Sequence, residues 1–204
     1  MERTAILSKC GKFRYRLGRR WAGGPTVVYV MLNPSTADHQ QDDATIRRCI
    51  SFAQAEGFGA LEVVNLFAYR TPHPAALKYA GFPVGADNDR HIVEACQAAE
   101  RVCLAWGAHE DAQPRVQVVM PLIRSTNLEP YCLAITRSGF PAHPVRLPKT
   151  SRMQPFTLEA IQAAMTGESL RVEPQLAPAP AARREGIQPG LWPFPVSAHM
   201  ENPQ

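Results

Sequence analysis

The stretch Thr26-Val27-Val28-Tyr29-Val30-Met31-Leu32 is an apolar run that ends abruptly at Asn33-Pro34-Ser35-Thr36, a sequence typical of turns. Three later apolar runs also stop at polar or turn-forming residues, namely at Asn65, at Trp106-Gly107 and in the segment 139–144. Short apolar runs separated by helical patterns are typical of parallel strands that are buried on both faces. We therefore expect an α/β protein, a three-layer α/β/α sandwich around a mostly parallel central sheet.

Helical periodicity fills the intervals between these runs. Helices are expected at about 44–56, 113–125 and 157–166. Asp43 is the natural N-cap of the first helix and Gly57 can close it, whereas Asn88 or Asp89 can cap a further helix ahead of the third strand. Because ligands bind beyond the carboxyl ends of parallel strands, the polar residues that follow the four runs are expected to line one shared pocket.

Composition divides the 204 residues into three parts. We expect residues 1–24 to form a basic strand or hairpin packed on the domain, and residues 25–170 to form the α/β/α domain. Prolines dominate residues 171–204, which predicts an extended or disordered tail. Its segment Gly190-Leu191-Trp192-Pro193-Phe194 is apolar enough either to fold back on the domain or to bind a partner protein.

The five cysteines are scattered and none forms a C-x-x-C pair, which argues against zinc and iron–sulfur sites. We therefore expect no metal and no cofactor. No apolar run reaches the roughly 18 to 20 residues that span a bilayer, and the N-terminus lacks the apolar segment of a signal peptide. These features predict a cytoplasmic protein without a membrane partner.

Residues 1–24 contain seven Lys and Arg residues against a single Glu, a local charge of +6 in a chain whose total is +4. Two interpretations are open. The segment can follow a nucleic-acid phosphate backbone through Arg14, Arg16, Arg19 and Arg20. Alternatively, it is an amphipathic hairpin whose arginines are solvated and whose inward side chains are Phe13, Tyr15 and Leu17.

Asn33 ends the first apolar run, and Pro34 favours an extended backbone there and presents the Asn33 amide. That amide can orient a water or a ligand, with Ser35 beside it as a substrate-binding candidate, but a simple turn explains the sequence equally well. Of the three aspartates that follow, one is expected to cap the helix and another can accept a proton from an attacking water. Asp43 is our catalytic candidate among them.

Four further candidates follow the later runs. Asn65 offers both a donor and an acceptor, as reading a base edge or an amide requires. Arg70 can reach a phosphate or can be a solvated side chain, and Trp106 either places a flat ring beside Gly107 or belongs to the core. His143 lies between two prolines and can donate a hydrogen bond to a developing anion or act as a general acid.

Together these segments resemble the bacterial domain-of-unknown-function 1643 family over nearly all of residues 10–150. The motifs that carry this resemblance are LNPSTAD at 32–38, DDATIRR at 42–48, VNLFA at 64–68, AWG at 105–107 and HP at 143–144. The name of that family conveys no activity.

The order of these motifs is also similar to the uracil-DNA glycosylase superfamily, especially its mismatch-specific and thymine-DNA branches. MLNPS at 31–35 resembles their G-I-N-P-G type motif, and VNLFAYRT at 64–71 resembles their T-N-L-V-x-R-x-T type segment. Trp106-Gly107 and His143-Pro144 match the strand-end W-G and the late H-P-S loop of other branches.

This second resemblance implies a glycosylase-like fold and a hydrolase that acts on a nucleobase N-glycosidic bond in DNA or in a modified nucleotide. It implies that His143 stabilises the anion of the departing base, that Asn33 positions a water and that Asn65 faces the base. A flipped nucleotide would be needed to reach such a pocket, so DNA or a nucleotide is the expected partner. The alternative is a non-catalytic nucleic-acid or nucleotide binding module on the same fold.

Overall fold

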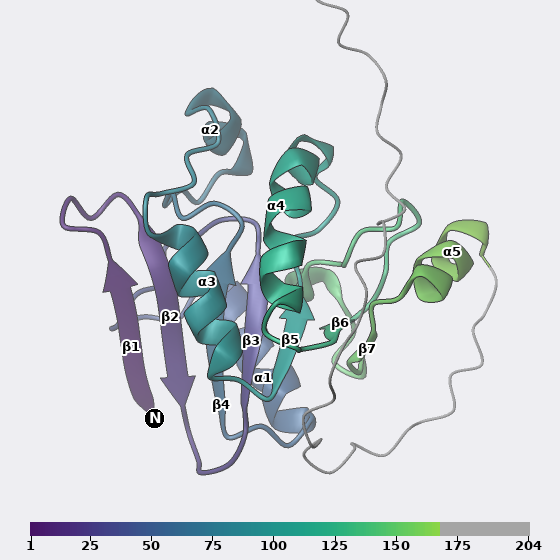
Figure 1. Ribbon diagram of the computed structural model, residues 1–204. Coiled ribbons are helices and arrows are strands. Elements are labelled where there is room, and N and C mark those ends of the chain that lie inside the picture. Colours follow the sequence, from purple (N-terminus) through teal and green to yellow (C-terminus); the bar gives the residue numbers. More distant parts are fainter. Residues whose placement is uncertain (168–204) are drawn as a thin grey trace, which may run out of the picture.

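The four apolar runs of the sequence form parallel strands inside a seven-stranded sheet, in the order β1-β2-β4-β3-β5-β6-β7 (Figure 1). This computed structural model describes residues 1–167, and the expectations for residues 171–204 lie outside that part. The strands are β1 (Glu2–Leu7), β2 (Arg14–Arg20), β3 (Thr26–Met31), β4 (Ala60–Asn65), β5 (Arg101–Leu104), β6 (Pro130–Cys132) and β7 (Gln154–Pro155). The helices are α1 (Ala44–Ala55), α2 (Pro74–Tyr79), α3 (Asn88–Gln97), α4 (Gln113–Arg124) and α5 (Leu158–Thr166), with 3-10 turns η1 (Glu110–Ala112) and η2 (Pro144–Arg146). The α/β class is confirmed.

The sheet is mixed, so the expectation of a mostly parallel sheet is wrong. β4, β3, β5 and β6 pair in parallel, but β1 with β2, β2 with β4 and β6 with β7 pair antiparallel, which makes three pairings of each kind. The six residues between β1 and β2 are too few for a crossover connection, so these two strands form a hairpin. β2 then extends the sheet at the outer edge of β4.

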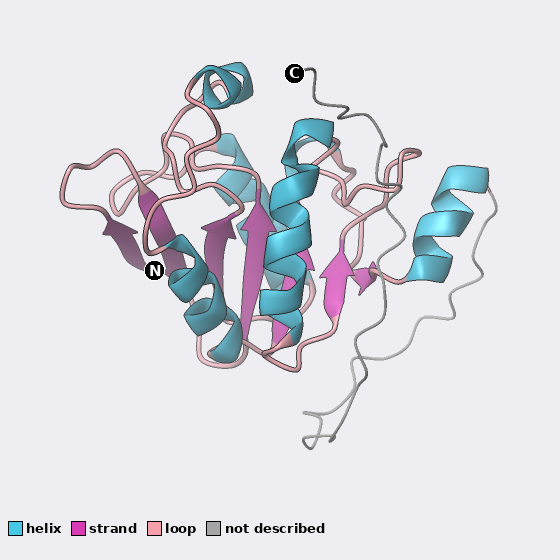
Figure 2. Cartoon of the chain, turned by 45° about the horizontal axis from the view of Figure 1, so that its top comes forward, coloured by secondary structure: helices cyan, strands magenta, loops and turns pink. Residues whose placement is uncertain are grey.

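Alternation along the strands sends apolar side chains into two cores, one on each face of the sheet. α3 and α4 cover the core that contains Val28 and Val30, whereas α1 covers the core that contains Val27 and Tyr29. Figures 1 and 2 show α1 on the far side of the sheet from α3 and α4. Within residues 1–167, no helix is long and apolar enough to span a membrane.

The helix ends follow from local chemistry. α1 begins after Asp43, whose Oδ1 accepts a hydrogen bond from the Ile46 N–H at 2.9 Å, and it is followed by Gly57 at φ +82°. Both predictions for α1 are confirmed. Neither residue that was predicted to cap α3 does so, because the N-cap is Asp87, which makes no side-chain capping bond, and Asn88 is already helical. The Asn88 side chain instead donates hydrogen bonds to the main chain at the end of β4.

Candidate functional site

Four loops meet at the edge of the sheet where the parallel strands end, which is the upper edge in Figure 1. They follow β3, β4, β5 and β6 and carry most of the predicted site residues. Main-chain hydrogen bonds continue beyond the strands: the Leu66 N–H donates to the Met31 carbonyl and the Ala105 N–H to the Val30 carbonyl, each at 2.8 Å. The loops therefore start from fixed points that lie side by side.

Asn65 is the last residue of β4 and is buried, with 1% of its surface exposed. It alternates with Leu61 and Val63, which places its side chain on the α1 face of the sheet. Within the described part of the chain, neither its Nδ2 nor its Oδ1 has a hydrogen-bond partner. A buried polar group without a partner costs about 1–3 kcal/mol. A ligand that accepts from Nδ2 and donates to Oδ1 would recover that free energy.

The main chain at the end of β4 is held from the opposite face. Asn88 donates from Nδ2 to the carbonyl oxygens of Asn65 and Leu66, at 2.9 and 3.1 Å. Arg115 in α4 donates from Nε to the Leu66 oxygen at 2.8 Å and pairs with Asp89. Sequence reasoning did not assign Asn88 or Arg115 to the site; a polar residue on the buried face of each helix was the only signal. Together they fix the backbone that carries the Asn65 side chain.

Asn33 ties its own loop to the loop that follows β4. Its Nδ2 donates to the carbonyls of Pro34 at 3.0 Å and Thr71 at 2.9 Å, and the Thr71 N–H donates to the Pro34 carbonyl at 2.9 Å. The amide nitrogen is therefore used within the protein, and Oδ1 remains to meet a water or a ligand. Ser35 is half-buried in the same loop. The turn and the functional interpretations of this sequence are thus compatible.

His143 is half-buried and lies directly before η2. Its Nδ1 accepts a hydrogen bond from the Val145 N–H at 3.4 Å, which assigns the ring hydrogen of the neutral form to Nε2. Burial lowers the pKa of His143 from its usual 6.5, and the charges of His109 and Arg146 lower it further, whereas Asp43 opposes the shift. The ring is therefore neutral at pH 7 and presents Nε2–H as a donor.

His109 is a functional candidate that sequence reasoning missed. It follows Gly107, whose φ is +80°, and a Cβ on that glycine would lie 3.5 Å from His143 Cβ and 3.6 Å from His109 Cδ2. The two histidines therefore flank Gly107, whose N–H donates to the Pro141 carbonyl at 2.9 Å and joins the two loops. Burial lowers the pKa of His109 as well. A single histidine in an irregular loop has no periodicity that signals its role.

A groove of about 480 Å³ adjoins His109 at the same edge of the sheet. Its apolar lining includes Leu32, Leu77 and Phe140, from three different loops or helices. This volume lies within the range of about 300–1,000 Å³ that is usual for small-molecule sites. The groove provides room for a nucleoside-sized ligand beside His109.

Asp43 combines the cap of α1 with a charge that acts on two other candidates. Its carboxylate raises the pKa of both Arg14 and His143, against the opposite effect of burial on each. Oδ1 is used in the helix cap, which leaves Oδ2 to accept a proton. From the start of α1 the Asp43 carboxylate thus acts electrostatically on both a guanidinium and an imidazole.

The predicted phosphate contacts of Arg14 and Arg19 are wrong, because these side chains are buried, with 2% and 1% of the residue exposed. Arg14 donates to the carbonyl of Ala37, and burial lowers its pKa to about 10. Solvated arginines, the other interpretation, are wrong at these two positions for the same reason. A bulge in β2 at residues 14–16, opposite residues 6–7 of β1, accompanies the burial of Arg14, where no phosphate backbone can reach it.

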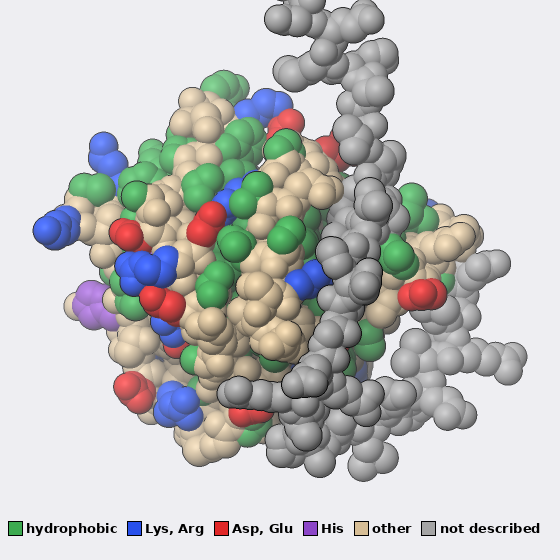
Figure 3. Space-filling view, viewed as in Figure 1, with side chains coloured by type: hydrophobic (Ala, Val, Ile, Leu, Met, Phe, Trp, Pro, Cys, Tyr) green, Lys and Arg blue, Asp and Glu red, His purple; other side chains and the backbone are tan. Residues whose placement is uncertain are grey.

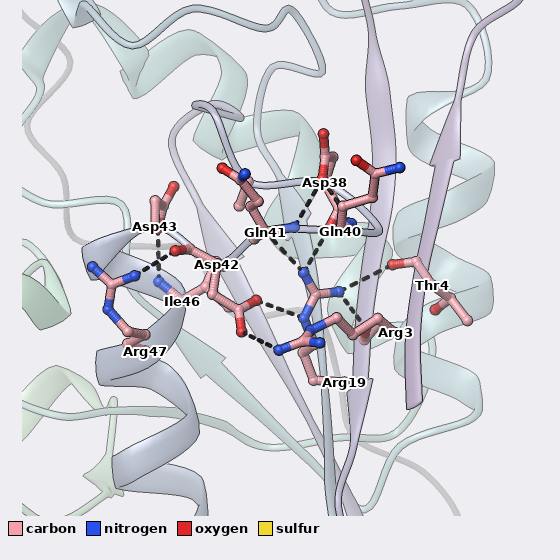
Figure 4. Close-up of polar contacts among 12 residues, drawn as sticks. Arg3, Thr4, Arg19, Asp38, Gln40, Gln41, Asp42, Asp43, Ile46 and Arg47 are labelled. Carbon is pink, nitrogen blue, oxygen red and sulfur yellow. Dashed lines mark hydrogen bonds and ion pairs between the residues drawn. The ribbon is translucent and has the colours of Figure 1, made fainter. Parts of the chain in front are cut away.

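Arg19 anchors the loop between β3 and α1 (Figure 4). Its Nε donates to Asp42 Oδ1 at 2.7 Å, and its terminal nitrogens donate to the carbonyls of Gly18, at 2.7 Å, and of Asp38. The guanidinium is therefore fully occupied in holding the segment that leads to Asp43. A basic residue at this position serves the site by fixing a loop.

The remaining arginines of the hairpin form no basic stripe. Arg16 pairs with Glu62 at 2.6 Å, and only Arg20 of the four candidates is exposed. Tyr15 and Leu17 are buried, as the amphipathic interpretation requires. On the face shown in Figure 3, basic and acidic side chains lie next to one another over the hairpin and α3. This mixture of charges does not favour a phosphate backbone.

The surroundings of Arg70 and Trp106 bear on the alternatives that the sequence left open for each residue. Arg70 is half-buried, donates to the Gly11 carbonyl at 3.4 Å and lies close enough to Arg14 to lower the pKa of that residue. Trp106 belongs to the core beneath α3 and α4, with 1% of its surface exposed. The structure therefore supports the core interpretation of Trp106 and does not place its ring beside Asn65.

Among residues 1–167, no group of three or more His, Cys, Asp or Glu side chains is arranged to hold a metal ion. No curated protein and no solved structure matches the chain. The model of a family described as "Protein of unknown function (DUF1643)" matches residues 14–145, which is more than half of the chain. That stretch contains the candidate site from Arg14 to His143. The chain therefore belongs to the DUF1643 family.

Proposed function

We propose that the protein is a glycosylase-like hydrolase that releases a nucleobase from DNA or from a modified nucleotide, on a three-layer fold like that of the uracil-DNA glycosylases. The observation that carries this proposal is the Asn65 amide, which is buried at the carboxyl edge of the sheet with both polar atoms unpartnered among residues 1–167. A nucleobase edge places a donor next to an acceptor, and a carboxamide can pair with both at once. Asn65 is accordingly assigned to base recognition.

His143 is assigned to the charge that develops on the base. When the N-glycosidic bond breaks, the departing base takes both bonding electrons and the sugar becomes oxocarbenium-like. A neutral Nε2–H can donate to the base as its negative charge grows, and the lowered pKa of His143 keeps the ring in this form at pH 7. Loss of one such preorganised donor costs about 2.7–4 kcal/mol of transition-state stabilisation.

The loop between β3 and α1 is assigned to the water that completes the reaction. Asn33 Oδ1 can orient this water, and Asp43 Oδ2 can accept its proton as the oxygen bonds to the sugar carbon. The other polar atoms of both side chains already hold the loop and the start of α1 in place. Ser35 and Arg70 lie on the two loops that Asn33 joins and are assigned to contacts with the sugar or phosphate.

One observation favours the second candidate, a non-catalytic nucleic-acid or nucleotide binding module. Asn33 Nδ2 and Asp43 Oδ1 both make hydrogen bonds that stabilise the fold, so these residues have a structural reason to be present without any reaction. In such a module Asn65 still recognises a base, but no bond is cleaved. The two candidates therefore differ in turnover and agree on the ligand.

Mass spectrometry of released bases tests the first candidate. The substrates are single- and double-stranded DNAs that carry uracil, mismatches or modified bases, together with free modified nucleotides. Wild type is compared with His143→Ala, and His39→Ala, an exposed histidine in the loop before α1, is the matched control. We expect wild type and the control to release a base, and His143→Ala to be about 10²–10³-fold slower.

Three other outcomes decide between the candidates. Equal release by a correctly folded His143→Ala protein would refute the role of His143. If wild type binds a substrate without releasing a base, and Asn65→Leu loses this binding, the binding module is established. If wild type neither releases a base from nor binds to any substrate in the panel, both candidates are refuted.

A further inference from the structure

Two histidine side chains, His109 and His143, approach Gly107, and Arg146 follows His143 in η2. We propose that His109, His143 and Arg146 form an anion site for a compact oxyanion, either the phosphate group of a nucleotide or the anionic oxygen of a released base. For a released base the inference rests on the proposed function; for a phosphate it is independent of catalysis.

The backbone brings these side chains together. A Cβ on Gly107 would lie 3.5 Å from His143 Cβ and 3.8 Å from His109 Nε2, so the two rings approach the same glycine. Arg146 follows His143 in η2, where its N–H donates to the His143 carbonyl at 3.4 Å. η2 therefore carries Arg146 three residues after His143, and the positive charge of Arg146 lowers the pKa of both histidines.

The donors of this cluster are not occupied by neighbouring residues. Within residues 1–167, the His109 ring and the Arg146 guanidinium make no hydrogen bond, and His143 uses only Nδ1. His109 also lines the groove of about 480 Å³, so a ligand has access to it. These donors are therefore available to a ligand.

The carboxylates near the cluster are few, and most have partners. Asp43 acts on His143 from the start of α1, where it caps the helix. Asp111 acts on His109 from η1, and it pairs with Lys78 of α2 at 2.9 Å. Glu110 lines the groove without such a partner among the described residues. The anion is therefore expected on the η2 side of His109, away from Glu110.

The segment that contains His143 and Arg146 supports this placement. Residues 130–158 include four Lys and Arg residues and no Asp or Glu. An anion beside η2 therefore meets positive charge from this segment, and the segment itself contributes no carboxylate. No comparable stretch remains in the hairpin, where Arg14 and Arg19 are buried.

Anion binding is expected to depend on pH. In the unliganded protein, burial lowers the pKa of both histidines, and each ring is also held neutral by the nearby charge of Arg146. A bound anion favours the protonated rings and raises both pKa values, so binding takes up protons. Affinity therefore increases as the pH falls from about 8 towards 6.

Titration of the full chain, followed by NMR of the histidine rings, tests the site. Inorganic phosphate is one probe, and a nitro-substituted uracil, an anion at neutral pH, is the other. We expect the His109 and His143 signals to move together and to saturate with at least one probe. His109→Gln and Arg146→Gln should each weaken binding about tenfold, the loss typical of one charge-assisted hydrogen bond. His39→Gln and Arg90→Gln are exposed matched controls and should bind as wild type does.

The two probes identify the source of the anion. A response to phosphate assigns the site to a nucleotide phosphate, whereas a response to the nitrouracil alone assigns it to the released base. The proposal is overturned if neither probe moves both rings, or if folded His109→Gln and Arg146→Gln proteins bind as tightly as wild type. Base release is measured separately, so an anion site without turnover refutes only the glycosylase, and turnover without an anion site refutes only this inference.

Discussion

Asn88 Nδ2 lies 2.9 Å from the main-chain oxygen of Asn65 and donates to it from the α3 side of the sheet, while the Asn65 side chain lies on the α1 side. One asparagine therefore fixes the backbone of another. This arrangement explains how β4 can end in an amide whose polar atoms have no partner among residues 1–167. The position of that amide is determined by the bonds of its backbone, and its side chain remains available to a ligand.

The first prediction concerns Asn88→Ala. The substitution removes hydrogen bonds to two buried carbonyls, at Asn65 and Leu66, and leaves Arg115 as the remaining side-chain donor to Leu66. We expect the free energy of unfolding to fall by about 2–3 kcal/mol. Urea denaturation measures this change. Arg90→Ala, an exposed change in the same helix, should alter the free energy by less than about 0.5 kcal/mol, and an equally small effect of Asn88→Ala would contradict the proposed support of β4.

The second prediction has the opposite sign. Asn65→Leu replaces a buried, unpartnered amide with an apolar side chain of similar size, so we expect it to raise the free energy of unfolding by about 1–2 kcal/mol. The same change should abolish binding of the nucleobase. Residues that are selected for ligand contacts often show this exchange between stability and function.

Denaturation and ligand binding are measured on the same preparation of Asn65→Leu. A substantial loss of stability would mean that the amide of Asn65 has partners in the folded protein and is not reserved for a ligand. Asn33→Ala is the matched comparison, because its amide does have partners, at Pro34 and Thr71, and its loss should lower stability.

Much of the central fold could be predicted from the sequence because local signals and packing agree there. The run at 26–32 is apolar on both faces, and it became β3, with one set of side chains under α1 and the other under α3 and α4. Asp43 and Gly57 are strong end signals, and α1 lies between them. The mixed direction of the sheet was missed because β2 and β7 pair antiparallel with β4 and β6, which are distant from them in sequence.

The site was less predictable, for physical reasons. Asn33 and Asn65 stand where apolar runs of the sequence end, and His143 lies between two prolines, so their positions signal them. The role of Arg19 depends on carbonyls some 20 residues away, and hydrophobic periodicity carries no information about such a partner. His109 was missed because its proximity to His143 comes from a bond between two loops, Gly107 N–H to the Pro141 carbonyl.

The third prediction tests the structural role of Arg19. Arg19→Ala removes a buried guanidinium that holds Asp42 and several carbonyls of the loop before α1. We expect a loss of about 3–5 kcal/mol in the free energy of unfolding, because the remaining carboxylate and carbonyls are left without their donor. Arg20→Ala is the matched control, because Arg20 follows Arg19 in β2 and its side chain is exposed. It should change the free energy of unfolding by less than about 0.5 kcal/mol. Similar small effects of both changes would restore Arg19 as a candidate for phosphate binding.

The fourth prediction follows from the lowered pKa of His143. The unfolded chain takes up a proton on this residue below pH 6.5, whereas the folded protein resists protonation until the lower, folded pKa is reached. His143 therefore contributes a loss of stability as the pH falls through the interval between these two values, and no further loss below it. His143→Gln lacks this contribution. We therefore expect the difference in the free energy of unfolding, wild type minus variant, to be smaller at pH 5 than at pH 7.5.

Urea denaturation at these two pH values, in a buffer without phosphate, measures the difference. Phosphate is excluded because an anion at His109 and His143 would favour the protonated rings and reduce the effect. Gln97→Ala, an exposed change at the end of α3 that does not titrate, controls for general effects of pH on the two measurements. If the difference between wild type and His143→Gln is the same at both pH values, His143 is not held neutral by the fold. In that case its assignment as a neutral Nε2–H donor fails, whatever the outcome of the base-release assay.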